Sequence, residues 1–277
     1  MLVHSAYGKS GVRLVQVVRA ADRHDLRDLT VAVRFRGHYD ESYTEGDNGA
    51  VLPTDTMKNT VYAMAARWGV QEPEAFAVKL AEHFLNRNPR LIRVRIDITE
   101  HPWGRIPAGK EEQAHAFVRS GPDTRTAAVQ ASRSTTMVGA GVSDLVILKS
   151  AYSAFAGFLR DEYTTLADTR DRLLATALTA TWRYRNREID FRPVWHAVRQ
   201  ALLDVFAGHH SESVQHTSYA MGQGVLDRIQ DVTAIRLVMP NKHHLPVDLS
   251  PFGLENRNEI FVATEEPHGL IEAMVVR

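Results

Sequence analysis

The chain has 277 residues, of which 44% are hydrophobic and 24% are charged, values typical of a globular protein with one large or two medium domains. Basic and acidic residues number 33 each, so no excess charge favours nucleic acid or an anionic membrane as a partner. Cysteine is absent, which excludes disulfides, thiolate metal sites and cysteine nucleophiles. We find no apolar run near the ~20 residues of a membrane span, no signal-like N-terminus and no C-terminal Ser-Lys-Leu. These features predict a cytoplasmic protein.

The first half of the chain has the pattern of antiparallel strands combined with helices. Alternating apolar and polar residues predict strands with one wet face, and apolar residues recurring every three or four positions predict helices. In chain order, the sequence predicts a turn at 7–11, strands at 12–19 and 29–37, a loop at 38–50, helices at 54–67 and 73–85, a strand at 91–99, and a hairpin of strands 114–120 and 124–133.

An apolar run and a group of aromatic residues follow near the middle of the chain. Residues 145–148 have the length and branching of a buried strand, and a turn of small residues follows at 149–153. Aromatic side chains then occur at Phe155, Phe158 and Tyr163. Such side chains either belong to the core or form a platform on which a flat ring stacks.

A helix is predicted directly after these aromatic residues. Thr165 is a suitable N-cap, Asp168 three residues later forms a variant of the capping box, and Arg172 would project from this helix two turns in. A guanidinium near an aromatic platform suits a flat anionic ligand, because it forks onto paired acceptors while the ring offers a face for stacking. The alternative is that Arg172 simply pairs with Asp168 one turn earlier.

The remaining elements repeat the order of the first half. The helices of the two halves carry similar segments, Thr60-Val61-Tyr62-Ala63-Met64 and Thr217-Ser218-Tyr219-Ala220-Met221. We therefore predict an α+β protein of two tandem units, 1–138 and 139–277, whose open sheet edges would invite pairing between subunits. The elements predicted after Arg172 are a strand at 175–185, a helix opened by Pro193, a helix from Ser213 to about Ile229, a strand at 232–240, and short strands at 259–264 and 270–276.

Several short motifs occur together in one order and resemble those of the urate oxidase (uricase) family. The most distinctive is Lys149-Ser150 followed by F-x-x-F, Y-T-T-L and a final arginine, which departs from the family at Ala151, where a small hydroxyl residue is usual. The resemblance extends from Tyr7 to Gly269. The other motifs are Tyr7-Gly8-Lys9, Thr54-Asp55 with Lys58-Asn59-Thr60, Ser213-Val214-Gln215, and Pro240-Asn241-Lys242-His243.

The resemblance implies a fold and an assembly. Members of this family adopt the tunnelling fold, in which each chain contains two antiparallel-sheet-plus-helices units. Sheets of two subunits close into a barrel on dimerisation, and two barrels stack as a homotetramer whose active sites are shared between subunits. The expected substrates are urate, dioxygen and water, and the expected products are 5-hydroxyisourate and hydrogen peroxide, without a cofactor or a metal.

The resemblance also implies the roles of ten residues. A cofactor-free oxidase must make its substrate a good electron donor, which removal of a proton achieves, so the site needs a base. The implied catalytic residues are Lys9 as the base, Thr54 as a proton relay and His243 as the end of the shuttle. The implied substrate-binding residues are Asp55 through its backbone, Phe155 by stacking, Leu166 and Val214 as lining, Arg172 and Gln215 at opposite edges, and Asn241 at the dioxygen position.

Two other functions remain open at this point. The same fold carries zinc-dependent purine and pterin ring hydrolases, and a purine-binding protein without catalysis would use a similar pocket. The 13 histidines show no His-Glu-x-x-His helix, and the pairs His209-His210 and His243-His244 point adjacent side chains apart. Taken singly, each site residue also has an ordinary interpretation: Lys9 as a surface lysine, Thr54 as a helix cap and Gln215 as a solvated residue.

Overall fold

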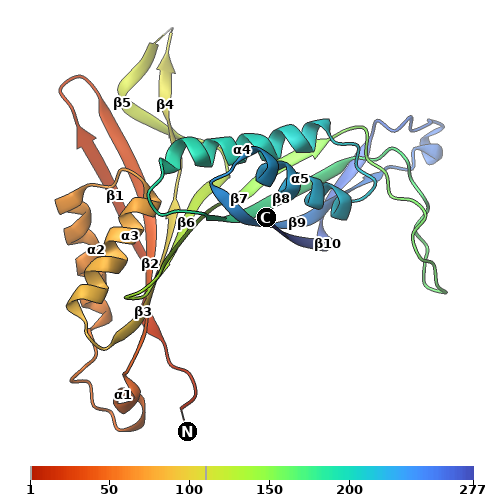
Figure 1. Cartoon of the computed structure of the whole chain (residues 1–277). Coiled ribbons are helices and arrows are strands. Elements are labelled where there is room, and N and C mark those ends of the chain that lie inside the picture. Colours follow the sequence, from red (N-terminus) through yellow and green to blue (C-terminus); the bar gives the residue numbers. More distant parts are fainter. Residues whose placement is uncertain (1, 110) are drawn as a thin grey trace. The chain divides into compact units, whose positions relative to one another are not determined.

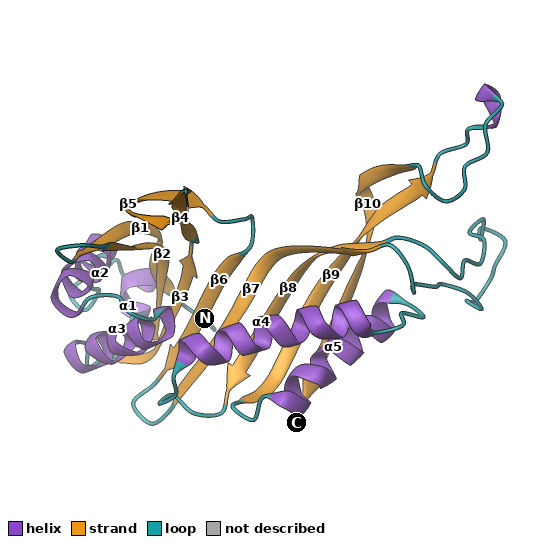
Figure 2. Ribbon diagram, turned by 90° about the horizontal axis from the view of Figure 1, so that it is seen from above, coloured by secondary structure: helices purple, strands orange, loops and turns teal. Residues whose placement is uncertain are grey.

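The computed structural model describes residues 2–109 and 111–277, which fold as an α+β protein (Figures 1 and 2). Contacts divide the chain into two compact units, Met1–Gly141 with Arg183–Pro193, and Val142–Trp182 with Val194–Arg277. The elements are β1 (Tyr7–Arg19), β2 (His24–Gly37), α1 (Asp40–Thr44), α2 (Thr54–Trp68), α3 (Pro73–Arg87), β3 (Leu91–Glu100), β4 (Trp103–Ala108), β5 (Glu111–Arg119), β6 (Thr124–Ala131), β7 (Thr136–Lys149), β8 (Leu174–Tyr184), α4 (Phe191–Gly208), α5 (Val214–Arg228), β9 (Val232–Pro246), η1 (Ser250–Phe252) and β10 (Phe261–Val276).

The strands are antiparallel, as the sequence predicts for an α+β protein. Eight of them form one sheet in the order β1-β2-β3-β6-β7-β8-β9-β10, and β4 and β5 form a second sheet of two strands. Helices α2 and α3 pack on one face of β1–β3, and α4 and α5 lie on one face of the strands from β7 to β10 (Figure 2). The predicted fold class is therefore confirmed.

The first unit has its core between β2, β3 and helix α3. Val31, Val33 and Phe35 of β2 are each at most 1% exposed, because alternate residues of a strand point to the same face. The ring of Phe35 meets Phe84 of α3 edge-on, with the ring centroids 5.0 Å apart. The alternation at 29–37 and the helical periodicity after Pro73 are thus confirmed.

The turn predicted at 7–11 is instead the beginning of β1. This strand pairs with β2 from Tyr7 onward, and its register shifts between Lys9 and Val12. Gly11 has a φ of 68°, which suits a bulge, and a Cβ on Gly8 would lie only 2.0 Å from the Val33 carbonyl oxygen. The two glycines therefore serve a bulged strand packed closely against its neighbour.

The hairpin predicted from 114–120 and 124–133 is wrong in its pairing. β5 pairs with β4 in the small sheet, whereas β6 pairs with β3 from Val94↔Ala131 to Glu100↔Arg125. Alternate residues of β6, including Ala127 and Val129, are buried, so this strand gains more by joining the sheet under the helices. The loop predicted at 38–50 also contains the short helix α1.

The second unit contains the other long strands and the two C-terminal helices. α5 begins where predicted, because the Ser213 hydroxyl accepts a hydrogen bond from the His216 amide at 3.1 Å. The predicted boundary between residues 138 and 139 lies inside the continuous strand β7 (Thr136–Lys149). The two short strands predicted near the C-terminus form one strand, β10, whose register against β9 shifts between Thr264 and Gly269.

The helix predicted from Thr165 to Arg172 does not form. Residues 156–168 contain no helix or strand, and the polar side chains there bond to one another. The Thr164 hydroxyl donates to the Asp161 carboxylate at 2.7 Å, and Asp168 accepts from Arg160 at 3.0 Å. Such local side-chain bonds compete with helix formation, so Arg172 is carried by a loop.

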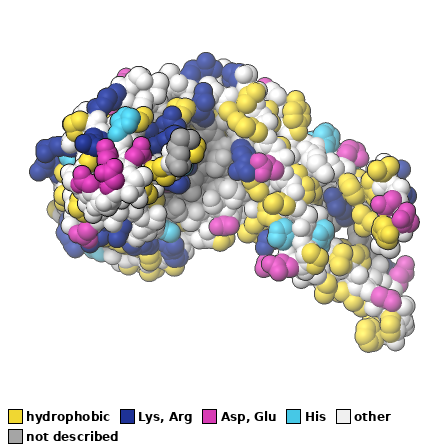
Figure 3. Space-filling model, turned by 90° about the horizontal axis from the view of Figure 1, so that it is seen from below, with side chains coloured by type: hydrophobic (Ala, Val, Ile, Leu, Met, Phe, Trp, Pro, Cys, Tyr) yellow, Lys and Arg dark blue, Asp and Glu magenta, His cyan; other side chains and the backbone are white. Residues whose placement is uncertain are grey.

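Two segments of the second unit expose large hydrophobic side chains. In Figure 3 these side chains gather at the right-hand end, where the loop before β8 and the loop before β10 project. Leu159 is 94% exposed, Tyr163 82% and Phe252 73%. Exposed apolar patches of this kind mark interaction surfaces.

No helix among the described residues is long and apolar enough to cross a membrane.

Candidate active site

A cavity of about 410 Å³ lies in the second unit, between the loop that precedes β8, the start of α5, and the ends of β9 and β10. Its size is within the range of small-molecule sites. All seven of the site residues predicted in the second half of the chain line this one cavity: Phe155, Leu166, Arg172, Val214, Gln215, Asn241 and His243.

Arg172 is the strongest electrostatic feature of the cavity. Its guanidinium Nε is buried without a hydrogen-bond partner, and no acidic side chain among the described residues lies within ion-pair distance. Asp168, the alternative partner, binds Arg160 instead. Burial disfavours the charged form of Arg172 and lowers the pKa of its guanidinium. A buried cation without a partner calls for an anionic ligand.

Phe155 lies beside Arg172, with the guanidinium carbon 5.4 Å from the ring centroid. Backbone hydrogen bonds of 2.8 and 3.0 Å join Phe155 to Thr169, and the Arg172 amide donates to the Ser153 carbonyl at 2.9 Å. The Ser211 carbonyl in turn accepts from the Ala154 amide at 2.7 Å. These bonds fix an irregular loop so that an aromatic ring and a guanidinium share one cavity.

The start of α5 provides another wall of the cavity. Val214 is 3% exposed, whereas Gln215 is exposed and its amide forms no hydrogen bond with the described residues. The Ser213 cap sets the direction of the helix and so places Gln215 in its first turn. A free amide in the cavity supplies one acceptor and two donors for a ligand edge.

Asn241 and His243 come from the end of β9. They are two residues apart on a strand, so their side chains point to the same face. Their partners on β10 are Gly269 and Thr264, and the register shift between these positions lies beside the cavity. The Thr264 hydroxyl donates to the His243 carbonyl at 3.4 Å. β-Bulges are common next to active sites, where they redirect side chains.

The cavity also contains residues that were not predicted. Lys242, from the motif Pro240-Asn241-Lys242-His243, forms an ion pair of 2.7 Å with Glu265. Asn258, which has a φ of 65°, and Phe261 come from the loop and strand at the C-terminal side. Nothing in the sequence distinguishes these two residues from ordinary loop and strand residues. Their position in the cavity lining depends on the tertiary conformation of the loop before β10.

The three site residues predicted in the first half lie in the first unit and do not line this cavity. Lys9 is half-buried on β1, directly before the bulge. Thr54 is the first residue of α2, which has Pro53 at its N-cap and no side-chain cap bond. The Thr54 hydroxyl forms no hydrogen bond with the described residues. The ordinary interpretation of Thr54 as a helix cap is therefore wrong, because Pro53 occupies the N-cap position.

Asp55 is fully exposed and binds within its own helix. A hydrogen bond of 2.5 Å to the Lys58 ammonium is the main reason that the pKa of Asp55 lies below its usual value. The Lys58 charge, an Asn59 hydrogen bond of 3.0 Å and the charge of Lys9 add to this effect. The Lys9 ammonium thus lies close enough to the N-terminus of α2 to act electrostatically on it. Since the carboxylate is occupied, the free backbone amides of the first turn are the groups left for a ligand.

Helix α2 is tied to β1 at both ends. The Tyr7 hydroxyl accepts a hydrogen bond from the Leu52 amide at 3.1 Å, just before the helix begins. Near the other end, the Gln16 amide donates to the Ala65 carbonyl at 3.0 Å. Burial, together with the Tyr39 charge, raises the pKa of Tyr7, so its phenol stays protonated. These bonds hold Lys9 and Thr54 in fixed positions on neighbouring elements.

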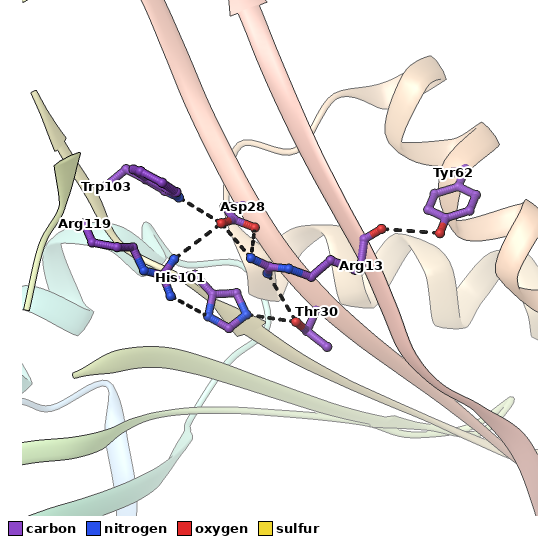
Figure 4. A network of polar contacts seen from close by, with 7 residues as sticks. All are labelled: Arg13, Asp28, Thr30, Tyr62, His101, Trp103 and Arg119. Carbon is purple, nitrogen blue, oxygen red and sulfur yellow. Dashed lines mark hydrogen bonds and ion pairs between the residues drawn. The ribbon is translucent and has the colours of Figure 1, made fainter. Parts of the chain in front are cut away.

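A polar network further along β1 links it to β2, β3 and the small sheet (Figure 4). At its centre is Asp28, which is 2% exposed and accepts hydrogen bonds from Arg13 at 2.7 Å and from the Trp103 indole at 2.8 Å. His101 lies 2.8 Å from the Thr30 hydroxyl and 3.3 Å from Arg119. Burial, followed by the Arg13 charge, lowers the pKa of His101. Among the described residues, no three histidine, aspartate or glutamate side chains gather as metal ligands here or elsewhere.

These features define an α+β protein whose second unit has a cavity suited in size and lining to a flat anionic ring. The sequence profile of the uricase family matches residues 5–130 and 138–272. The uricase of Arthrobacter globiformis is 43% identical over 277 residues, covering 100% of this chain and 90% of that protein. The uricase of Danio rerio is 36% identical, covering 99% and 94%. The chain therefore belongs to the uricase family, and the resemblance noted in its motifs is confirmed.

Solved structures agree with this assignment. The crystal structure of the Arthrobacter globiformis uricase superposes with a TM-score of 0.96 at 43% identity, covering 100% of this chain and 95% of that one. A uricase structure from Bacillus fastidious gives a TM-score of 0.85 at 26% identity, covering 98% and 93%. The tunnelling fold of the family is thus the fold of this chain.

Proposed function

We infer that the chain oxidises urate to 5-hydroxyisourate, the activity of the family to which it belongs. In the full reaction proposed here, urate, dioxygen and water give 5-hydroxyisourate and hydrogen peroxide. Two electrons leave urate and reduce dioxygen to peroxide, and water supplies the hydroxyl group at C5. The observation that supports the site assignment is the convergence of seven predicted residues on one cavity, among them Arg172, whose buried Nε has no hydrogen-bond partner among the described residues.

Binding is assigned to the residues of the second-unit cavity. Arg172 would fork onto one edge of the urate anion, because its guanidinium has no anionic partner among the described residues. Gln215 would meet the opposite edge with its free amide, and Phe155 would stack on the ring. Leu166 and Val214 complete the apolar lining. Two polar clamps across a stacking platform fix the ring in one orientation, and orientation is a large part of catalysis.

Proton transfer is assigned to Lys9, Thr54 and His243. Dioxygen reacts slowly with closed-shell molecules, so the enzyme must raise the electron-donating power of urate by removing a second proton. Lys9 would accept that proton, and the Thr54 hydroxyl, which has no hydrogen-bond partner among the described residues, would relay it. His243 would complete the shuttle from the other side, while Asn241 in the same cavity would hold dioxygen and later water.

The assembly is part of the same proposal. We propose that the chain contains two tunnelling-fold repeats, 1–138 and 139–277, and forms a homotetramer in the cytoplasm. Lys9, Thr54 and the backbone at Asp55 would then complete the cavity of another subunit. Supporting this, the two groups of residues belong to different compact units, and the cavity lining comes from the second unit. Closed two-fold symmetry would give two such sites per dimer.

One experiment tests the reaction directly. Purified protein is mixed with urate in air, with and without a metal chelator, and the ultraviolet absorbance of urate, dissolved dioxygen and hydrogen peroxide are followed together. We expect equal molar loss of urate and dioxygen with formation of peroxide, unchanged by chelator. Activity that chelator removes and zinc or copper restores would contradict the cofactor-free mechanism, and urate binding without turnover would leave only a purine-binding protein.

A further inference from the structure

The loop that carries Phe155 and Arg172 contains a series of stacked side chains that extends beyond the proposed binding residues. The Phe155 and Phe158 rings stack with their centroids 4.9 Å apart and an interplanar angle of 11°. The guanidinium carbon of Arg160 lies 4.7 Å from the Phe158 centroid. Together with Arg172 beside Phe155, the contacts run Arg172–Phe155–Phe158–Arg160. Stacking and cation–π attraction both favour contacts at these distances.

Phe158 covers one face of the Phe155 ring, and the Arg172 guanidinium also approaches this ring. Phe155 lines the cavity, whereas Phe158 does not, so Phe158 backs the ring from outside the cavity. A purine ring must therefore stack on the cavity side of Phe155. The orientation of that face depends on Phe158, because the two rings are nearly parallel.

Arg160 holds the wall of the cavity next to this platform. Its guanidinium donates to the Leu166 carbonyl and to the Asp168 carboxylate, each at 3.0 Å. Both acceptor residues line the cavity, and Arg160 does not. Because residues 156–168 have no helix or strand to hold them, these side-chain contacts decide where the wall lies.

The two arginines of the series differ in their charge balance. Arg160 is paired with Asp168, so its charge is neutralised next to the site. Arg172 has no such partner among the described residues and stays available for an anion. Arg160 therefore supports the loop without competing with Arg172 for the substrate.

We propose that Phe158 and Arg160 are positioning residues of the purine site. Phe158 sets the plane of Phe155, and Arg160 fixes Leu166 and Asp168 in the cavity wall. The proposal rests on the role of Phe155 as the stacking platform. Neither residue touches the substrate, so each acts through a neighbour and should affect binding of the ring more than the chemical step.

The test compares ring-removing and ring-keeping variants of Phe158. Phe158→Ala should raise the KM for urate and the Kd for xanthine, a flat purine without the 8-oxo group, by about two- to tenfold, the range for one stacked aromatic pair. The kcat should change little. Phe158→Tyr keeps the ring and should bind both purines like the wild type. Calorimetry with xanthine does not need turnover, so it separates this proposal from the proposed reaction.

The second part of the test removes one positive charge from the same loop, either at Arg160 or at the control position Arg170. Arg160→Ala should weaken xanthine binding by a similar factor, because it releases both Leu166 and Asp168. Arg170→Ala is the matched control: Arg170 is exposed and forms no ion pair with the described residues, so the same change in charge should leave binding unchanged.

A mutant cycle decides whether Phe158 acts through Phe155. In the Phe155→Ala background, removal of the Phe158 ring should have no further effect on Kd, since coupled residues are not additive. Wild-type Kd in Phe158→Ala, or an equal loss with and without the Phe155 ring, would overturn the proposal. If Phe158→Ala lowers the melting temperature strongly, Phe158→Leu, which keeps bulk without a ring, replaces it in the same cycle.

Discussion

In the proposed function, the two units of this chain would contribute different parts of one active site. The second unit has a cavity lined by an aromatic ring, a half-buried arginine and an exposed glutamine amide, which together suit binding of a planar anion. The first unit presents Lys9 on a strand and Thr54 on a helix N-terminus, without lining that cavity. Binding groups and proton-transfer groups are thus separated along the chain.

This difference explains why, under the proposed mechanism, neither unit would be sufficient for catalysis by itself. A cavity that binds urate without a base would hold the ring without activating it toward dioxygen. A base and a hydroxyl without a cavity would have no fixed substrate to act on, and the advantage of orientation would be lost. If assembly joins the two groups, as proposed, catalysis depends on the correct pairing of subunits.

The largest effect is expected from changes to the proton-transfer residues of the first unit. Lys9→Met and Thr54→Ala should each lower kcat by about 10²–10⁴-fold, the usual contribution of general acid–base assistance, while the Kd for xanthine stays near that of the wild type. The double variant should be little worse than the worse single one, because the two residues act as a unit. Steady-state kinetics test this, and multiplying losses would show independent roles.

Subunit mixing tests whether the two units combine across chains. Lys9→Met and Arg172→Gln chains, each inactive when pure, are unfolded and refolded together. Random pairing makes about half of the dimers hybrid, and each hybrid has one intact site, so about a quarter of the wild-type activity should return. Activity that stays at the level of the separate variants, with mixing proven by mass spectrometry of differently tagged chains, would place each site within one chain.

A smaller effect is expected from the shape of the cation in the second unit. Arg172→Lys keeps the charge and loses the planar fork, so we expect the KM for urate to rise by about ten- to a hundredfold. The kcat should fall less than in the Lys9 variant. Arg170→Lys, in the same loop but outside the cavity, is the control. Unchanged KM in Arg172→Lys would show that the guanidinium does not meet the substrate.

The smallest expected effect is on the pH dependence of stability, through two histidines, one in each unit. Burial is the main cause that lowers the pKa of both His101 and His209 from 6.5, and neighbouring cationic groups, first Arg13 and His216 respectively, add to it. At pH values between 6.5 and the lower pKa of the folded state, the unfolded chain binds more protons than the folded chain does. The free energy of unfolding should therefore fall as the pH falls through 6.5. Thermal melts from pH 7.5 to 5 should show this, and His101→Asn or His209→Asn should reduce the slope.

Local signals in the sequence determined most of the elements. The alternation at 29–37, the Pro73 helix start and the Ser213 cap each depend on neighbours a few residues away, and all three are found in the structure. The motif residues were likewise identified by their order along the chain. Their proposed roles come from the resemblance of these motifs to the uricase family.

The tertiary structure alone decided which segments meet. β6 pairs with β3 instead of β5, because its alternating apolar face is buried under the helices, and this gain is not visible in the turn that precedes it. The predicted helix at Thr165 gives way to a loop held by Arg160, Phe158 and the bridge to Thr169. Long-range contacts of this kind override local propensity, and they are what brings Phe155, Gln215 and His243 from three distant segments into one cavity.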